Sequence, residues 1–432
     1  MKYRYLSIMV LILILSIGTV CAQDIAADAE DAVAEGSNDV LSVDNNVNIL
    51  ENEISSGSSV PIENDAILEN ANISDNDKLL GNINENAVGE SINVTNDTFF
   101  EVFNETGYLR DNITADTLIF SGKFEGNNLS LENIIINRTV NLEGNSARLI
   151  DLAFVILSDN VTVGGFDIHS GSLSDIISIR EADNVLIQNN NFTIGVFDDG
   201  DSYGINVIDS NYVTLYNNII YYSVFANDTS QKKAIYAKGS EYLNITHNDL
   251  TVFLPPRPVD WDTGIVYSEA VFLNDCDNAV LNDNVILTFS YGDAISEYDT
   301  IYALHVLGDN ATITESEILL SNAPCGYGIV VSGENFNISN SEHIDVNNGT
   351  YSCGIEVDGV SNGVIDYNNI NAVGESAYGI YTANWAGDVV ANITGNVINA
   401  EGITAFGMSL SGSEAIVNLN EIIMNDGNYT TG

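Results

Sequence analysis

The stretch that decides the fold is VLIQNNNF at residues 185–192, which returns as VTLYNNII at residues 213–220. In each copy, two apolar side chains are separated by one residue. An Asn follows three positions after the second of them, and another apolar residue follows after five. Alternation over so short a run is typical of a β-strand, and Asn is typical of a turn. The stretch therefore predicts a short strand, a tight turn and a second strand.

The same unit recurs along the chain at intervals of 24 to 36 residues. Its first apolar column contains Val163, Ile187, Leu215, Ile245, Leu281, Ile313, Ile338, Ile365, Ile393 and Val417. Its second apolar column contains Ile168, Phe192, Ile220, Leu250, Ile286, Ile318, Ile370, Ile398 and Ile422. The Asn between the two columns is found at Asn190, Asn218, Asn248, Asn284, Asn368, Asn396 and Asn420. Units of this length without a 3.6-residue period indicate coils of three short strands, each paired in parallel with its equivalent one coil away.

A further column precedes many of these units by ten to fourteen residues. It consists of Gly204-Ile205, Gly328-Ile329, Gly354-Ile355, Gly379-Ile380 and Gly407-Met408. Together the columns predict an all-β fold, a right-handed parallel β-helix (solenoid) of about ten or more coils. We expect the repeated Asn residues to sit at a turn, because Asn tolerates the left-handed conformation, and to stack into a structural ladder along the axis.

The charge of the chain limits its partners. It has 61 acidic and 12 basic residues, for a net charge of -49. Such a surface repels phosphates and anionic lipid headgroups, which excludes nucleic acid and membrane surfaces as partners and favours a monomer. Because 45% of the residues are hydrophobic, much of the chain can nevertheless bury a core.

The N-terminus predicts export. Residues 1–22 have a short basic start, an apolar run from Leu6 to Ile17 and the small-x-small sequence Val20-Cys21-Ala22, as in a Sec-type signal peptide. An uncleaved anchor and lipidation of Cys21 are the alternatives. We expect no other membrane span, and an extracellular or cell-surface location.

The rest of the chain divides into three predicted segments. Residues 23–96 are rich in acidic residues, Ala, Ser and Asn without a sustained period, which indicates a disordered acidic linker. Residues 97–150 are predicted to form a cap and the first coils, with strands near 117–120 and 134–136 and a short helix or strand at 99–103. Residues 151–432 are predicted to form the β-helix repeats.

Three cysteines remain after the predicted signal peptide: Cys276, Cys325 and Cys353. An odd and sparse set argues against a disulfide scaffold. Buried free thiols are one interpretation, and a Cys325–Cys353 bridge between adjacent coils is the other.

The densest acidic cluster comprises Asp198, Asp199 and Asp201. Carboxylates in a short loop are ligands that calcium prefers, so these residues are the candidate metal site. A solvated turn is the alternative, because acidic runs are expected in this composition. We expect no other cofactor.

No catalytic constellation is evident in the sequence. The four His residues, His169, His247, His305 and His343, occupy unrelated repeat positions. Arg138, Arg148 and Arg180 have no obvious catalytic setting. We therefore expect a protein that is not an enzyme.

The longest interval between units contains the Pro-rich segment at residues 254–262. Proline cannot join a strand ladder, so this segment should project as a stiff loop. Trp261, flanked by Asp260 and Asp262, could stack on a sugar there, which makes these three residues the candidate ligand site. A loop packed against the coil wall is the alternative.

The repeat resembles those of pectin-lyase-like proteins, and the whole layout resembles the adhesin-like surface proteins of methanogenic archaea. The resemblance covers about residues 97–432. It is carried by FFEVFN at residues 99–104, DTL at 116–118, INRTVNL at 136–142 and NVTVGGF at 160–166. Members of this family often continue into C-terminal immunoglobulin-like or wall-attachment modules, which this sequence does not contain. It is expected to be a fragment or a short soluble member.

The resemblance implies an exported surface protein that binds glycans or other cell-surface molecules. One alternative is a polysaccharide lyase or glycoside hydrolase, since such folds also carry enzymes of this kind. The other is a purely structural wall component.

Overall fold

The computed structural model describes residues 89–145, 147–171, 173, 175–226, 228–260, 265–291, 296, 298–359, 362–383, 389–411, 413–425 and 429–431. The chain divides into two units, residues 1–83 and 84–432, and the described residues belong to the second. The predicted signal peptide and most of the predicted linker therefore lie outside the described residues. Within the described part of the chain, no helix is long and apolar enough to cross a membrane.

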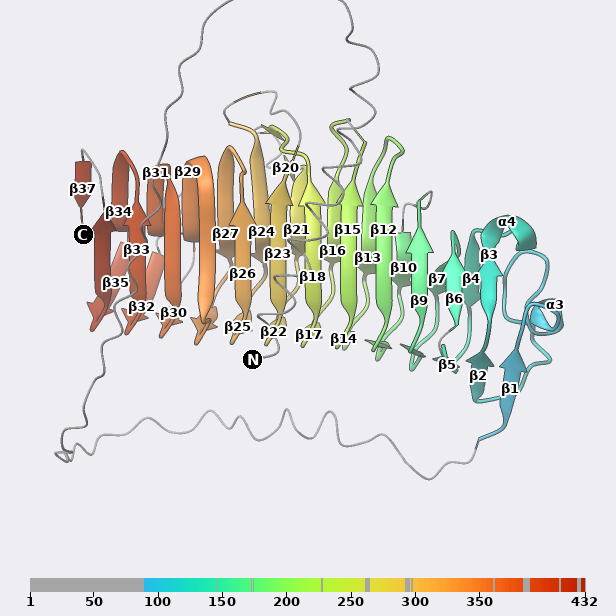
Figure 1. Ribbon diagram of the computed structural model, residues 1–432. Coiled ribbons are helices and arrows are strands. Elements are labelled where there is room, and N and C mark those ends of the chain that lie inside the picture. The colour runs from blue at the N-terminus through green and yellow to red at the C-terminus, as the bar shows by residue number, and fades with distance from the viewer. Residues whose placement is uncertain are drawn as a thin grey trace, which may run out of the picture. The chain divides into compact units, whose positions relative to one another are not determined.

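The described unit is a parallel β-helix in which each coil contributes three strands (Figure 1). The first strands form a 13-stranded sheet: β1 (Ser91–Val94), β2 (Thr117–Phe120), β5 (Asn141–Glu143), β8 (Thr162–Gly164), β11 (Leu186–Gln188), β14 (Thr214–Tyr216), β17 (Asn244–Thr246), β22 (Val280–Asn282), β25 (Thr312–Thr314), β28 (Asn337–Ser339), β30 (Gly363–Asp366), β32 (Val389–Thr394) and β35 (Ser413–Asn418). All its pairings are parallel, each with the next coil.

The second and third strands are joined in a 22-stranded sheet. The second strands are β3 (Lys123–Glu125), β6 (Arg148–Ile150), β9 (Asp167–Ser170), β12 (Asn191–Val196), β15 (Ile219–Val224), β18 (Asp249–Leu254), β23 (Val285–Ser290), β26 (Glu317–Ser321), the first halves of β29 (His343–Asp358) and β31 (Asn369–Ala383), β33 (Val397–Glu401) and β36 (Glu421–Asn425). The third strands are β4 (Asn133–Ile136), β7 (Ala153–Ile156), β10 (Asp175–Arg180), β13 (Ser202–Ile208), β16 (Lys232–Lys238), β21 (Ser268–Asn274), β24 (Thr300–Leu307), β27 (Cys325–Ser332), the second halves of β29 and β31, β34 (Thr404–Leu410) and β37 (Tyr429–Thr431). The two sets count as one sheet because β29 and β31 continue around the corner.

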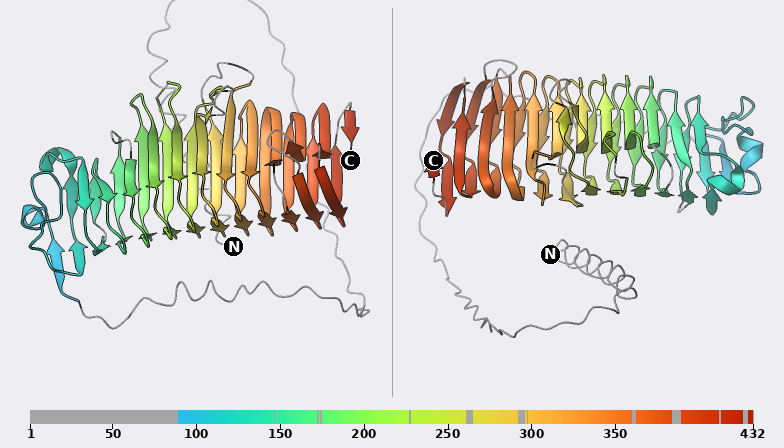
Figure 2. Two further views of the ribbon diagram at one scale, coloured as in Figure 1. Left: turned by 180° about the vertical axis from the view of Figure 1, so that it is seen from behind. Right: turned by 90° about the horizontal axis from the view of Figure 1, so that it is seen from above.

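Strand register confirms the predicted columns. Val163 pairs with Ile187, Ile187 with Leu215, and the first column continues in this way to Val417. The second column runs in register from Ile168 to Ile422, and it also includes Ile344, which the repeat pattern had not assigned. These side chains fill the interior of the coils, where nearly all are less than 2% exposed. Their burial is the main source of stability for the stack. Figure 2 shows that the coils follow one another in chain order from one end to the other.

The Asn ladder exists, but the reason expected for it was wrong. The left-handed residue of each turn is the one before the ladder position, for example Asn189, His247 and Tyr367, with φ of 55°, 58° and 54°. The ladder Asn instead turns inward. Asn218 Nδ2 donates to Asn248 Oδ1 at 3.0 Å and to the Ile187 carbonyl, one coil back, at 2.9 Å. An amide suits this position because its Nδ2 donates to both neighbouring coils while its Oδ1 accepts from the preceding Asn.

The ladder is interrupted where Ser316 and Ser341 replace Asn. The backbone N–H of Asn284 donates to Ser316 Oγ at 3.4 Å. Beyond the two serines, the amide ladder resumes at Asn368, which donates to Asn396 at 3.1 Å. A hydroxyl can accept the turn N–H but cannot reproduce the two donors of an amide.

A second ladder, built from carboxylates, accounts for part of the acidic composition. It lies at the turn between the third and first strands. Asp159 Oδ1 accepts the N–H of Asp183 at 2.8 Å, and Asp277 Oδ1 accepts the N–H of Asp309 at 2.7 Å. Asp309 in turn accepts the N–H of Glu334 at 2.7 Å. Acidic residues at this edge thus satisfy backbone donors of the following coil.

The N-terminal end of the stack is closed by aromatic packing. Helix α3 (Phe99–Val102) places Phe99 over Phe124, with ring centroids 6.0 Å apart, and Phe103 stacks on Phe99 at 4.9 Å. A second short helix, α4 (Gly126–Leu129), follows β3. The predicted strands at 117–120 and 134–136 are present as β2 and β4, and the predicted cap begins with a helix. Strand β1 lies inside residues 23–96, so the last part of the predicted linker belongs to the solenoid.

The glycine column is explained by close packing within the third strands. A Cβ on Gly354 would lie 2.4 Å from Cγ2 of Ile370 and 2.7 Å from the carbonyl oxygen of Gly379. Real side chains do not make such contacts, so glycine lets the second column approach the backbone.

The three described cysteines are free thiols, and the bridge between Cys325 and Cys353 is not formed. The register explains this, because Cys353 pairs with Tyr327 and Cys325 with Tyr351. The interpretation as free thiols is therefore confirmed.

Candidate functional site

The candidate site lies on the outward side of the third strands, which we call the third-sheet face. Two columns of side chains point outward there. One runs through Asp175, Tyr203, Lys233, Glu269, Tyr302, Tyr327, Cys353, Tyr378 and Phe406. The other runs through Val155, Ser178, Asn206, Tyr236, Phe272, His305, Val330, Glu356, Tyr381 and Ser409. Inward neighbours such as Ile205 and Ile235 are fully buried, so the two columns carry the chemistry of this face.

A chain of contacting rings crosses this face, which we call the aromatic strip. Its members are Tyr203, Tyr236, Phe272, His305, Tyr302, Tyr327, Tyr351, Tyr378 and Phe406. Neighbouring centroids are 4.7 to 5.7 Å apart, which follows from the roughly 4.8 Å spacing of paired strands. Each pair contributes about 0.5–1.5 kcal/mol beyond its area burial. The strip therefore stiffens the stack and also gives one face a continuous line of partly buried rings.

Burial of the tyrosines has an electrostatic consequence. Desolvation raises the pKa of Tyr302, Tyr327 and Tyr351 far above the ordinary value, and the nearby Glu356 carboxyl adds to the increase for each. Their hydroxyls are therefore neutral hydrogen-bonding groups at any physiological pH.

Three ionisable side chains form a buried cluster within the strip. Lys233 Nζ lies 2.9 Å from Glu269 Oε2, and Glu269 Oε1 lies 2.6 Å from Nδ1 of His305. These side chains come from β16, β21 and β24, three consecutive coils. Lys233 is fully buried, Glu269 is 1% exposed and His305 is 8% exposed. Moving such charges from water costs several kcal/mol per ion, so the outward side of a surface sheet is an unusual place for them.

The surroundings of the cluster fix its geometry. Lys233 Nζ also donates to Gln231 Oε1 at 3.0 Å and lies 5.4 Å from the centroid of the Phe272 ring. The His305 ring stacks on Phe272 with centroids 4.8 Å apart and meets the edge of Tyr302 at 5.0 Å. The Glu269 carboxylate is hydrogen-bonded to Nδ1 of His305, and none of the hydrogen bonds among the described residues involves Nε2 of His305. A carboxylate that orients one imidazole nitrogen leaves the other available to a ligand.

Glu356 is a second perturbed carboxyl on this face. It lies on β29 between Val330 and Tyr381 in the same column as His305. Burial raises its pKa to about 7, and the nearby Asp358 carboxylate adds to the effect. Glu356 is three coils from Glu269, which at about 4.8 Å a coil is roughly 14 Å. This exceeds the separation of up to about 9.5 Å that two-carboxylate glycoside hydrolysis requires.

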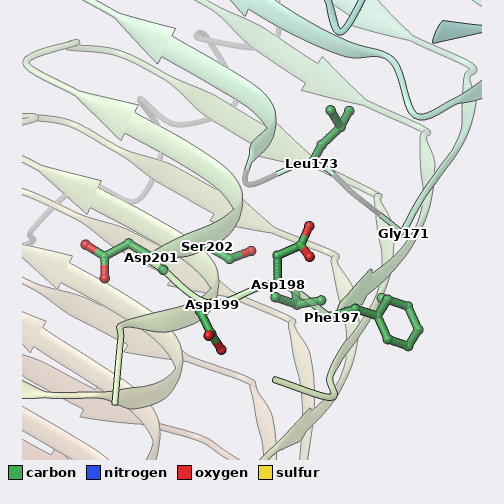
Figure 3. A pocket seen from close by; sticks show the side chains of 10 residues that line it. Gly171, Leu173, Phe197, Asp198, Asp199, Asp201 and Ser202 are labelled. Carbon is green, nitrogen blue, oxygen red and sulfur yellow. The ribbon is translucent and has the colours of Figure 1, made fainter. Parts of the chain in front are cut away.

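The candidate calcium loop has an internal cation. Lys232, which is 1% exposed, donates from Nζ to the carbonyl oxygens of Asp198, at 3.3 Å, and Gly200. Asp201 Oδ1 accepts the backbone N–H of Gln231 at 2.9 Å. Figure 3 shows the carboxylates of Asp198, Asp199 and Asp201 pointing in different directions around a small pocket. Among the described residues, no group of three or more His, Cys, Asp or Glu side chains could hold a metal ion. Calcium at this loop stays a prediction.

The candidate ligand loop is only partly described. Trp261 and Asp262 lie outside the described residues. Asp260 belongs to β19 (Val259–Asp260), which pairs antiparallel with β20 (Ile265–Val266), so the loop carries a short hairpin. Its base is held by Arg257, which is 2% exposed and donates from Nε to the Asp228 carbonyl at 2.7 Å. The first part of the segment packs against the coils, since Leu254, Pro255, Pro256 and Arg257 are buried. Ligand binding by the three residues stays a prediction.

Sequence reasoning missed the buried cluster. His305 was weighed alone, and Lys233 and Glu269 were not considered. Lys233 and Glu269 are register partners 36 residues apart, but His305 is the register partner of Phe272, so no single repeat position joins the three residues. The three coils involved have Ala234, Ala270 and Ala303 where other coils have Gly. The glycine column therefore does not mark the third strands of these coils in the sequence.

Comparison with known proteins gives matches by structure alone. No protein-family model and no curated protein sequence matches the chain. The catalytic domain of a GH87 α-1,3-glucanase in complex with tetrasaccharides is 13% identical, with a TM-score of 0.35, covering 73% of this chain and 65% of that one. The chain thus spans slightly less than two thirds of that structure.

Other solved structures match at a similar level. A point mutant of the periplasmic alginate epimerase AlgG is 9% identical, with a TM-score of 0.41, covering 77% of this chain and 84% of that chain. The A-module of the Azotobacter vinelandii mannuronan C-5 epimerase AlgE6 is 13% identical, with a TM-score of 0.35, covering 80% and 89%. Such distant likenesses do not bear on activity, and assignment of this chain to the parallel β-helix class rests on its own strand register.

Proposed function

We propose that the protein is an exported glycan-binding solenoid and that the third-sheet face binds the glycan. The aromatic strip is the observation that carries the proposal. It is a chain of nine contacting rings over eight coils, from β13 to β34, and it passes between neighbouring register columns of the third strands. Aromatic rings offer sugars large apolar contacts at a small cost in conformational entropy, while tyrosine hydroxyls supply hydrogen bonds.

The charge of the protein favours an uncharged glycan. At a net charge of -49, the protein as a whole repels polyanions. On the third-sheet face, however, charges are largely balanced, with Lys233 against Glu269 and Arg180 against Asp175. The partners that we propose for adhesin-like binding are therefore neutral cell-surface polysaccharides. The predicted signal peptide agrees with a location outside the cell.

Binding to a panel of neutral polysaccharides and oligosaccharides, measured by glycan array and calorimetry with the purified protein, tests the proposal. Tyr236→Ala and Tyr378→Ala should each weaken binding about tenfold, the equivalent of about 1.4 kcal/mol. The matched control is Tyr212→Ala. Tyr212 stacks on Tyr242 at 4.8 Å in the same way but lies at the turn before the first strand. The proposal fails if no glycan binds at millimolar concentration, or if the control variant loses as much affinity as the strip variants.

A second candidate function, acid–base processing of the bound glycan, is favoured by the Lys233–Glu269–His305 cluster. A histidine whose Nδ1 is held by a buried carboxylate can transfer a proton at Nε2. The separation of Glu269 and Glu356 speaks against two-carboxylate hydrolysis. Elimination is the better fit, and because the proton that it removes must be made acidic by a neighbouring carboxyl group, it would act on a uronate polysaccharide and not on a neutral glycan. Incubation with neutral and acidic polysaccharides should be monitored for unsaturated sugars and for new reducing ends. Turnover that disappears in His305→Ala would support this function, and the absence of turnover on every polysaccharide would leave binding alone.

A further inference from the structure

One end of the third-sheet face has a hollow of about 430 Å³. Its lining includes Glu132, as well as Ala153 and Val155 of β7, and Asp175, Ser178 and Arg180 of β10. Ligand sites of small molecules generally occupy about 300–1,000 Å³, so the hollow has the size of a site for a small ligand.

The hollow results from a change of side-chain size within one register column. The column that holds Tyr236, Phe272 and His305 in later coils holds Val155 and Ser178 here, with Asn206 between the small and the aromatic members. The surface therefore drops where the rings end. The first ring of the aromatic strip, Tyr203, is paired with Asp175 at the rim of the hollow.

The polar groups of the hollow are already oriented. Arg180 Nε donates to Ser178 Oγ at 2.9 Å, and Arg180 Nη2 lies 3.7 Å from Asp175 Oδ2. Asn206 Nδ2 donates to the same carboxylate oxygen at 2.9 Å. The Asp175 side chain is 16% exposed and that of Arg180 is 55% exposed. A carboxylate that accepts and a guanidinium that donates, fixed side by side, match a pair of neighbouring sugar hydroxyls.

We infer that this hollow is a subsite for a single neutral pyranose unit, from which the rest of the glycan continues over Tyr203 onto the aromatic strip. The inference rests on the proposed glycan binding and adds the place and kind of the anchoring contact. Glu132 and Asp175 against Arg180 give the lining more negative than positive charge, so it disfavours a uronate as the bound unit. Recognition by a carboxylate and a guanidinium is directional, whereas stacking on rings is not, so the hollow supplies specificity.

The test fills the hollow without disturbing the fold. Ser178→Tyr places a ring at a register position that holds Tyr236 two coils later, so the strand can accommodate it. Thr214→Tyr is the matched control, since Thr214 is a half-buried residue on β14 of the first sheet, outside the third-sheet face. Calorimetry with the bound oligosaccharide should show at least about tenfold weaker binding for Ser178→Tyr and unchanged binding for Thr214→Tyr. Thermal unfolding followed by circular dichroism verifies that both variants fold.

Competition with a panel of neutral methyl pyranosides provides a second readout. One of them should displace the oligosaccharide from the wild-type protein. The Arg180→Met substitution should weaken the binding of that monosaccharide by about tenfold as well. If Tyr236→Ala weakens binding while Ser178→Tyr does not, the subsite is wrong and the proposed function stands. If Ser178→Tyr and Thr214→Tyr lose affinity alike, the subsite is also wrong. If the wild type binds no glycan, the proposed function itself fails.

Discussion

Nδ1 of His305 lies 2.6 Å from Oε1 of Glu269, although 36 residues separate them in the chain. Together with Lys233, they form a buried cluster of ionisable side chains that coil stacking assembles from three separate repeats. Buried ions of this kind depend strongly on their partners. Removing one leaves an uncompensated charge, whereas removing both can be nearly neutral.

We therefore expect strong coupling between Lys233 and Glu269. Lys233→Met and Glu269→Met should each destabilise the protein by about 3–5 kcal/mol, and the double variant should cost much less than their sum, because neither of the two charges is then left without its partner. Urea unfolding of the four proteins measures the cycle. Lys123→Met is the control, because the Lys123–Glu125 pair is exposed and should contribute about 1 kcal/mol or less. Additive single-variant effects would contradict the buried network.

Glu356 should make stability depend on pH. Burial raises its folded-state pKa to about 7, above the ordinary value of 4.5. The neutral carboxyl is thus the form that the fold favours. Its contribution is fully present below about pH 4.5 and is lost as the pH rises through about 7.

The Glu356→Gln variant tests this dependence. Relative to the wild type, it should gain about 3 kcal/mol of unfolding free energy between pH 4.5 and pH 8, since one pKa unit corresponds to about 1.36 kcal/mol. Glu375→Gln, at an exposed position of β31, is the control and should show no such trend. A difference between Glu356→Gln and wild type that stays constant with pH would show that this carboxyl is not perturbed.

The sequence predicts the interior of the fold better than its surface. Ile187, Leu215 and the other column members are constrained by burial in every coil, so they recur and reveal the register. The members of the glycine column recur for the same reason, because the backbone at these positions of the third strands contacts the next coil. The left-handed turn position was missed because backbone geometry alone selects it, and residues as different as Asn189, His247 and Tyr367 occupy it.

The candidate site has no such periodic signal. Lys233, Glu269 and His305 each occur once, and only their coil-to-coil proximity makes them a cluster. The hollow is even less visible, since it consists of small residues where larger ones occur elsewhere. To predict a site that consists of contacts between unlike residues in neighbouring coils, the strand register must be known. The sequence gives that register only after all the repeats have been aligned.

The glycine column leads to a prediction about packing. Gly354→Ala would place a methyl group 2.4 Å from Ile370 Cγ2 and 2.7 Å from the Gly379 carbonyl oxygen. Because backbone cannot yield easily, we expect a loss of about 1–3 kcal/mol, measured by chemical denaturation. Gly171→Ala is the matched control, as its Cβ would meet only the Phe197 ring at 3.8 Å. Equal stability of the two variants would refute the packing explanation for the glycine column.

The Asn ladder leads to a prediction about graded loss of hydrogen bonds. Asn248 Nδ2 donates to Asn284 Oδ1 at 3.1 Å and to the Leu215 carbonyl at 2.8 Å, while its Oδ1 accepts from the N–H and the Nδ2 of Asn218 at 3.0 Å. Asn248→Ala leaves buried donors without acceptors and should cost about 2–3 kcal/mol.

A serine at the same position should separate the acceptor role of the ladder side chain from its donor role. Asn248→Ser keeps an acceptor for the turn N–H, as Ser316 does for Asn284, and should therefore recover part of that loss. Asn191→Ala, which removes an exposed bond to Asp167, is the control and should change stability by less than about 0.5 kcal/mol. The unfolding midpoints in urea rank the four proteins. If Asn248→Ala were no less stable than Asn191→Ala, the ladder would be a by-product of the turn and would not hold the coils together.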